Sequence, residues 1–188
     1  MTKSQEAAHA RDNNSAYWRF GAMIVTSMIV MFGLMYFNTY AFEHVRWSET
    51  RFYMTFIMGG AMAIVMLSFM LGMYQNTKTN IAIFIGSAVV ILLALWLVRS
   101  QTTVDDESYM RAMIPHHSIA IMTSERAGFE DVRVQKLANE IIEAQRREIK
   151  EMDWLIRDIK ENGPVTTQAQ AAARPVPDFE GSLDPKSN

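Results

Sequence analysis

The chain has 188 residues, of which 49% are hydrophobic and 20% charged, with a formal net charge of −2 and no cysteine. The lack of cysteine excludes a disulfide framework, a zinc ribbon and a thiol nucleophile, and the balanced charge without a basic cluster argues against nucleic-acid binding. No charged residue occurs between Arg19 and Glu43, between Arg51 and Lys78, or between Lys78 and Arg99. Each uncharged run is long enough to cross a bilayer as a helix, which excludes a purely soluble globular domain.

The first half of the chain predicts a polar tail and a three-helix transmembrane domain. The tail, residues 1–19, ends in Tyr17, Trp18 and Arg19, residue types that anchor a span at the membrane interface. The transmembrane domain covers residues 20–98, with spans at about 20–42, 52–74 and 81–98. The first span is too long for a signal-peptide core, so we expect it to be retained. The Lys and Arg residues flanking the spans are equally divided between the two sides, so charge alone does not orient the protein.

The second half predicts a soluble two-helix hairpin. A linker at 99–104 leads into the hairpin at 105–162, whose first helix begins in an acidic cluster suited to a helix N-terminus. This helix is expected to end at Gly128, and the second is expected to end at Asn162, before Gly163 and a proline. The remaining segment, 163–188, holds four of the five prolines and has little to bury, so disorder is expected there.

The predicted contact between the two hairpin helices contains unusual residues. In the second helix, steps of three and four residues define an apolar seam that is interrupted by Gln145 and Glu148, beside Met152. In the first helix the same spacing selects Met110, Met113 and His117. Folding the hairpin brings the two sets opposite each other, which makes them candidates for a binding site.

A histidine pair follows a proline in the first hairpin helix. Pro115 inside a helix removes a backbone hydrogen bond and costs about 3 kcal/mol, and a local break there would turn His116 and His117 toward one pocket. The alternative is one exposed imidazole and one buried imidazole that simply bonds to Gln145 or Glu148. On the first interpretation Gln145 supports the metal ligands, which are His116, His117, Met110, Met113, Met152 and Glu148.

The same residues form a paired motif that resembles a known family. Met-x-x-His-His at 113–117 and Gln-x-x-Glu-x-x-x-Met at 145–152 resemble the ferritin-like family catalogued as domain of unknown function 305, over residues 104–160. The resemblance implies a helical bundle, usually exported or membrane-anchored, with copper binding or copper tolerance attributed to some members. The three-span half also looks like that of membrane-bound members. Longer relatives carry two hairpins in tandem, whereas this chain carries one.

Methionines recur at every fourth residue of the second predicted span. They are Met54, Met58, Met62, Met66 and Met70. Because four residues advance a helix by about 400°, the row winds slowly along one side of the span. Packing is the simpler interpretation, since methionine fills gaps between helices. A membrane path for Cu(I) or Ag(I) is the alternative, because thioethers suit soft ions.

Together these features predict an all-α protein with three transmembrane helices and a hairpin that forms half of a ferritin-like bundle. We expect a membrane-anchored binding protein for a soft metal, Cu(I) or Cu(II), that serves in metal tolerance or handling and is not an enzyme. One alternative is a structural or assembly protein whose histidine pair only fixes helix packing. A ferritin-like oxidoreductase is less favoured, because no Glu stands three residues before either histidine.

The expected partners are the lipid bilayer and a second copy of the chain, with no nucleic acid. A hairpin of about 60 residues buries too little surface to be secure alone, so a homodimer with a four-helix bundle is expected. The family resemblance places the hairpin outside the cytoplasmic membrane.

Overall fold

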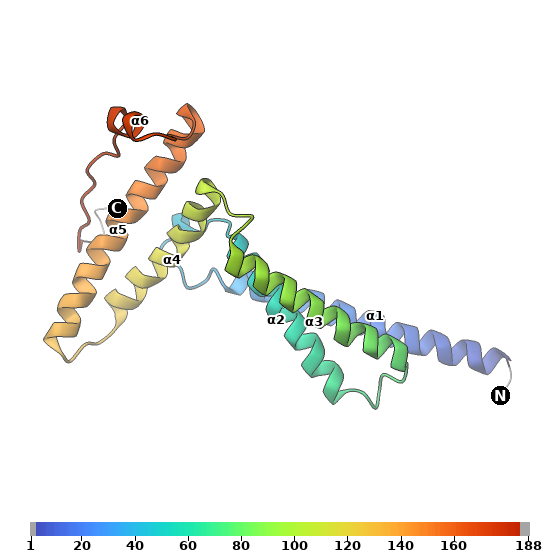
Figure 1. Cartoon of the computed structure of the whole chain (residues 1–188). Coiled ribbons are helices and arrows are strands. Elements are labelled where there is room, and N and C mark those ends of the chain that lie inside the picture. Colours follow the sequence, from blue (N-terminus) through green and yellow to red (C-terminus); the bar gives the residue numbers. More distant parts are fainter. Residues whose placement is uncertain (1–2, 185–188) are drawn as a thin grey trace. The chain divides into compact units, whose positions relative to one another are not determined.

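The computed structural model describes residues 3–184, and their side chains from residue 15 onward. This part of the chain is helical and contains no strand (Figure 1). The helices are α1 (Lys3–Leu34), η1 (Phe42–His44), α2 (Glu49–Phe69), α3 (Thr77–Ser100), α4 (Asp106–Arg126), α5 (Val132–Asn162) and α6 (Gln168–Ala173). The chain divides into two compact units, one formed by residues up to Met35 together with Thr50–Thr103, the other by Tyr36–Glu49 together with the chain from Val104 onward.

The first unit contains three helices that are long and apolar enough to cross a membrane. These segments are Ser15–Leu34, Glu49–Phe69 and Thr77–Ser100. Helix α1 starts well before the first segment, so residues 3–19 are helical rather than a separate tail. This stretch contains neither Gly nor Pro, the residues that most strongly oppose a helix.

The first predicted span extends too far at its C-terminal end. Helix α1 ends at Leu34, and Thr39 then closes a turn in which its hydroxyl donates to the Tyr36 carbonyl at 3.0 Å. Such local side-chain bonds compete with helix continuation. Residues 36–42, expected inside the membrane, therefore belong to the second unit.

Two adjacent glycines set the close packing of the spans. A Cβ at Gly59 would lie 2.4 Å from Met28 Sδ of α1, and a Cβ at Gly60 would lie 2.8 Å from a side-chain carbon of Ile91 of α3. Only glycine fits at both positions without a shift. Small residues thus allow α2 to approach its two neighbours closely, as is common between membrane helices.

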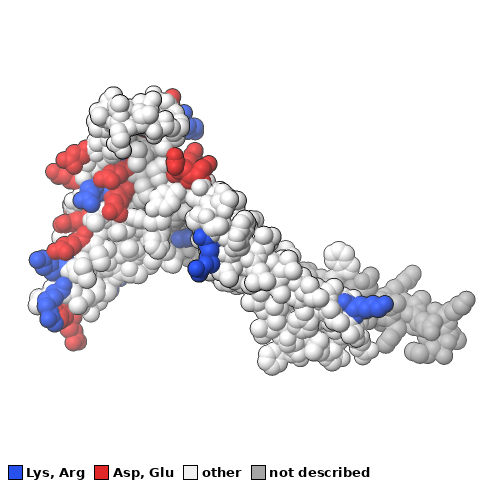
Figure 2. Space-filling model, viewed as in Figure 1, with Lys and Arg blue, Asp and Glu red and all other residues white. Residues whose placement is uncertain are grey.

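Helices α4 and α5 form the expected hairpin in the second unit. Asp105 caps α4 by accepting from Ser108 N at 2.7 Å, and Asp131 caps α5 by accepting from Arg133 N at 2.8 Å. A hydrophobic core joins the helices through Met110, Ile114, Ile121, Ile142, Ile149 and Met152. Charged side chains gather on this unit, whereas the visible surface of the spans is nearly uncharged (Figure 2).

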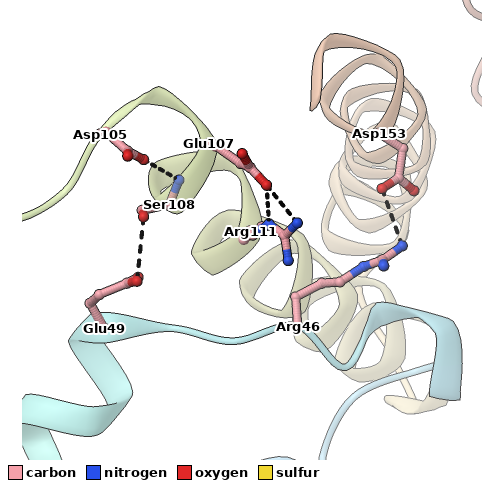
Figure 3. A network of polar contacts seen from close by, with 7 residues as sticks. All are labelled: Arg46, Glu49, Asp105, Glu107, Ser108, Arg111 and Asp153. Carbon is pink, nitrogen blue, oxygen red and sulfur yellow. Dashed lines mark hydrogen bonds and ion pairs between the residues drawn. The ribbon is translucent and has the colours of Figure 1, made fainter. Parts of the chain in front are cut away.

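The segment 36–49, which we call the strap, packs on the hairpin. The amide N–H of Tyr40 donates to Ser118 Oγ at 2.7 Å, and Arg46 Nη2 lies 3.3 Å from Asp153 Oδ1. Figure 3 shows Arg46 reaching Asp153 of α5, and Glu49 meeting Ser108 of α4, with an Oγ to Oε1 distance of 3.3 Å. The hairpin unit is therefore built from two stretches of sequence.

The C-terminal segment differs from the expected disorder. It contains the short helix α6, and Arg174 Nε lies 3.0 Å from Asp158 Oδ2 of α5. Further along, Lys150 Nζ donates to the carbonyl of Glu180 at 3.3 Å, and a Cβ at Gly181 would lie 1.9 Å from the carbonyl oxygen of Glu143. Backbone contacts of this kind need few apolar side chains, which explains why composition missed them. Residues 185–188 lie outside the described part.

Candidate functional site

A histidine and a carboxylate meet in the hairpin. His117 Nε2 of α4 lies 2.7 Å from Glu148 Oε2 of α5, and His117 Nδ1 lies 2.9 Å from the carbonyl oxygen of Met113. The imidazole is buried, with 8% of the residue exposed, whereas 39% of the Glu148 side chain is exposed. Two polar residues that the seam pattern placed on facing helices are thus in direct contact.

The geometry of this pair constrains its protons. A carbonyl oxygen accepts hydrogen bonds only, and so does an ionised carboxylate. Both ring nitrogens of His117 face such acceptors, so an imidazolium with an ionised Glu148, or a neutral ring with a protonated Glu148, satisfies both contacts. A metal ion at Nε2 would have to displace the proton shared with Glu148.

Three methionines expected at the site lie in the core that joins the same two helices. Met110 and Met152 are buried members of this core, and Met113 packs against it while partly buried. Met110 and Met152 therefore lie in the low-polarity interior between α4 and α5, together with Ile114 and Ile149. Gln145 is half-buried on α5.

The two histidines do not share a pocket. Helix α4 runs through Pro115 without interruption, so the expected local break is absent. Consecutive residues of a continuous helix point about 100° apart, and His116 is accordingly exposed while His117 is buried. Their ring centroids lie 6.2 Å apart. The expectation that both imidazoles turn toward one pocket is therefore wrong.

The donor set restricts which metals could fit. Among the described residues, no three or more His, Asp or Glu side chains are grouped closely enough to hold a metal ion. What the hairpin core offers is one imidazole, one carboxylate and thioethers. Thioethers suit Cu(I) and Ag(I), whereas Mg²⁺ and Ca²⁺ prefer several oxygen ligands. A donor set of this kind would suit a soft ion better than Mg²⁺ or Ca²⁺.

The methionine row in the membrane half has a packing role at one end. Met66 and Met70 pack against the buried cluster that contains Phe20, Leu67 and Tyr74. Met70 lies just beyond the end of α2. Met54 is exposed, and Met58 and Met62 are partly exposed.

In the middle of α5 the buried face is displaced by one residue from the predicted seam, whereas Ala138 and Met152 are buried as predicted. The buried positions of this helix are Ala138, Ile142, Arg146, Ile149 and Met152. Steps of three and four residues also place Val134 and Ile141 in the predicted seam, but Val134 is exposed and Ile141 is only partly buried. The reason is that the strap and the C-terminal segment cover a side of α5 that an isolated hairpin would expose to water.

Arg146 is a buried polar residue that the sequence did not single out. Only 2% of it is exposed, and it pairs with Glu125 of α4. Its Nη2 lies 3.4 Å from Tyr40 Oη, its Nη1 donates to the Ser182 carbonyl, and its guanidinium carbon lies 5.7 Å from the Tyr40 ring centroid. Arg146 thus joins α4, the strap and the C-terminal segment. In sequence nothing distinguishes it from its exposed neighbour Arg147.

A second buried histidine lies in the strap. His44 Nδ1 lies 2.9 Å from Ser118 Oγ. Burial lowers the pKa of His44 from its ordinary value, Asp153 and Glu43 partly offset this effect, and Arg46 adds to it. His44 was not among the candidate residues, because its role depends on the docking of the strap.

The class defined by fold and site is a helical-hairpin protein with three membrane-length helices and a buried histidine that contacts a partly exposed glutamate. The chain belongs to the family described as Domain of unknown function (DUF305), whose model matches residues 100–184. It is also similar to "Uncharacterized protein L153" of Acanthamoeba polyphaga mimivirus, with 32% identity over 146 residues that cover 74% of this chain and 94% of that protein. No solved structure matches the chain.

Proposed function

We propose that this is a membrane-anchored protein that binds a soft metal ion, copper, through the hairpin core and serves in metal tolerance or handling. The observation that carries the proposal is the His117–Glu148 contact between two helices whose shared core also holds Met110 and Met152. Imidazole and thioether donors together favour copper among the biological metals. Met113 adds a third thioether at the edge of the core.

In this proposal the metal replaces a proton. His117 binds through Nε2 in its neutral form, while Nδ1 keeps its bond to the Met113 carbonyl and fixes the ring. Glu148 either enters the ligand set or stays as the partner that orients the ring. Binding therefore competes with protonation, as for any histidine ligand.

The membrane part of the proposal rests on the three apolar helices. They support membrane anchoring by length and composition. We place the N-terminus in the cytoplasm and the hairpin outside the cytoplasmic membrane. Fusing a reporter that is active only in the cytoplasm near the C-terminus would test this placement. Activity of that fusion would contradict the assignment.

The proposal also includes a homodimer. Tyr109 on α4 and Val134 and Leu137 on α5 are exposed large apolar residues of the hairpin. A second hairpin covering them would complete a four-helix bundle. Mass measurement of the protein in detergent would reveal the dimer, and a monomer at every concentration would contradict it.

The decisive experiment is a Cu(I) competition titration of the full-length protein in detergent, with His117→Gln and Met152→Leu as test variants. His116→Gln is the matched control, because His116 is exposed next to the site. We expect losing the His117 ligand to weaken Cu(I) binding by at least about tenfold, and the control to change it little. If the two histidine variants bind alike, or wild type binds no Cu(I), the proposal is wrong.

A structural role for the pair is the second candidate. It is favoured by one observation: both ring nitrogens of His117 already have acceptors at hydrogen-bonding distance. In that case His117→Gln would lower the stability of the hairpin while wild type would show no Cu(I) binding. The same titration, combined with an unfolding measurement, separates the two candidates.

A further inference from the structure

A small pocket lies at the C-terminal end of α5, where the chain turns back and places α6 beside that end (Figure 1). Its volume is about 210 Å³, and its walls come from the first turn of α4, the C-terminal part of α5 and the segment 164–176. All three belong to the unit that contains the hairpin. No residue of the proposed metal site lines the pocket, so the two sites can be tested independently.

The walls of the pocket are mostly apolar. Leu155 and Ile159 of α5 line it and also pack against the hairpin core, which fixes this wall. Val165 and Val176 come from the C-terminal segment and are 37% and 43% exposed, so their apolar surface still meets water. An apolar cavity of about 150 Å³ holds a benzene molecule. The pocket therefore has room for one aromatic ring with a short substituent.

The charged residues of the lining leave one carboxylate uncompensated. Arg174 Nε lies 3.0 Å from Asp158 Oδ2, and Nη2 of the same guanidinium donates to the Gly163 carbonyl at 2.6 Å. Asp106 is the other charged residue of the lining, and it takes part in no hydrogen bond or ion pair with the described residues. Because the charges of Asp158 and Arg174 cancel, the lining carries one net negative charge.

The helix ends around the pocket do not compensate that charge. The N-terminus of α4 carries a partial positive charge, and the C-terminus of α5 carries a partial negative charge. Both ends border the pocket, so their effects oppose each other. The Asp106 carboxylate therefore sets the sign of a ligand, and it favours a cation.

We propose that this pocket binds a small organic cation, in which one apolar ring is joined to one ammonium group. The ring would lie against Leu155 and Ile159, and the ammonium group would pair with Asp106. Trp154 also lines the pocket, and tryptophan is the aromatic side chain that attracts cations most strongly. A metal ion fits less well, because Mg²⁺ and Ca²⁺ require several oxygen ligands and the lining offers one free carboxylate.

The test is a calorimetric titration of the full-length protein in detergent with two probes of nearly equal shape. Benzylammonium carries the positive charge, and benzyl alcohol lacks it. Asp106→Asn removes the carboxylate, and Glu107→Gln is the matched control, because Glu107 lies in the same first turn of α4 and does not line the pocket. Ala171→Phe fills the pocket, and Ala172→Phe, at a position of the same helix α6 outside the lining, is its matched control.

We expect wild type to bind benzylammonium at least about threefold more tightly than benzyl alcohol, as for an exposed ion pair. Asp106→Asn should abolish this preference, and Glu107→Gln should keep it. Benzyl alcohol binding that persists in Asp106→Asn shows that the pocket is intact, so this comparison does not depend on the folding of Ala171→Phe.

The pocket-filled variant locates the binding. Ala171→Phe should bind neither probe and reports the heat of probes that enter the detergent, whereas Ala172→Phe should bind both as wild type does. The proposal is overturned if wild type binds neither probe or binds both equally. It is also overturned if the preference survives in Asp106→Asn, or if Ala171→Phe binds as tightly as wild type.

Discussion

Ser118 Oγ lies 2.9 Å from His44 Nδ1, although 74 positions separate the two residues in sequence. The same oxygen accepts from Tyr40 N at 2.7 Å, and Ser118 is completely buried. Because Tyr40 N–H occupies the oxygen as a donor, the hydroxyl hydrogen is available to donate to the Nδ1 lone pair of a neutral His44. One hydroxyl on α4 thus holds two residues of the strap.

Ser118→Ala should therefore destabilise the hairpin unit. The change leaves the buried Tyr40 N–H and His44 Nδ1 without this partner, which typically costs about 1–3 kcal/mol. Chemical unfolding in detergent, followed by circular dichroism, measures the loss. Ser124→Ala on the same helix is the control and should cost less than about 0.5 kcal/mol. Equal losses in the two variants would mean that the Ser118 contacts contribute nothing.

Acidification should weaken the docking of the strap through His44. The folded pKa of His44 is lowered from 6.5, chiefly by burial, so the unfolded state binds more protons there. The stability that this group contributes is full above its unfolded value and is lost as pH falls through the folded value. Unfolding free energies measured at a series of pH values from about 8 to about 5 should decline more steeply in wild type than in His44→Gln. Parallel pH profiles would contradict this assignment.

The proposed copper binding at His117 should release a proton. His117 Nε2 lies 2.7 Å from Glu148 Oε2, and a metal at Nε2 would displace the proton of this hydrogen bond. Calorimetric titrations with Cu(I) in buffers of different ionisation enthalpy should report release of about one proton per ion. With Glu148→Gln the neutral ring no longer needs that proton, and the release should fall. An unchanged release in the variant would exclude the His117–Glu148 pair as its source.

Gly181 should tolerate no side chain. A Cβ there would lie 1.9 Å from the carbonyl oxygen of Glu143, in the backbone of α5, so Gly181→Ala must move the C-terminal segment away. We expect faster hydrogen exchange and faster cleavage by a broad-specificity protease in residues 174–184. Gly128→Ala is the control, because a Cβ at Gly128 meets nothing within 4 Å. A segment equally protected in both variants would refute the packing.

The helical architecture could be predicted from sequence because its signals are local. The uncharged runs mark the membrane-length helices, and the capping residues Asp105 and Asp131 with Gly163 mark the hairpin helices. Helical spacing also placed His117 and Glu148 on facing helices, and the interpretation with one buried imidazole bonded to Gln145 or Glu148 includes their contact. These features depend on residues within one helix or on two helices joined by a short turn.

The remaining features depend on contacts between distant segments. Residues 36–42 read as membrane helix because they carry no charge, and only the docking of Tyr40 on Ser118 reveals their place. That docking covers α5 on one side and turns its buried face onto Arg146, so the predicted seam was displaced by one position. The continuous helix through Pro115 likewise shows that packing outweighs the local cost of the proline.

The strap makes the hairpin domain discontinuous in the chain, which limits how the protein can be dissected or recombined. A fragment beginning at residue 100, where the family match also begins, would leave Ser118 and Asp153 without Tyr40, His44 and Arg46. Exchanging the membrane half for an unrelated anchor would remove the same three partners. The strap, which connects the first two spans, must therefore be inherited together with the hairpin. Substitutions in either part constrain those that the other part tolerates.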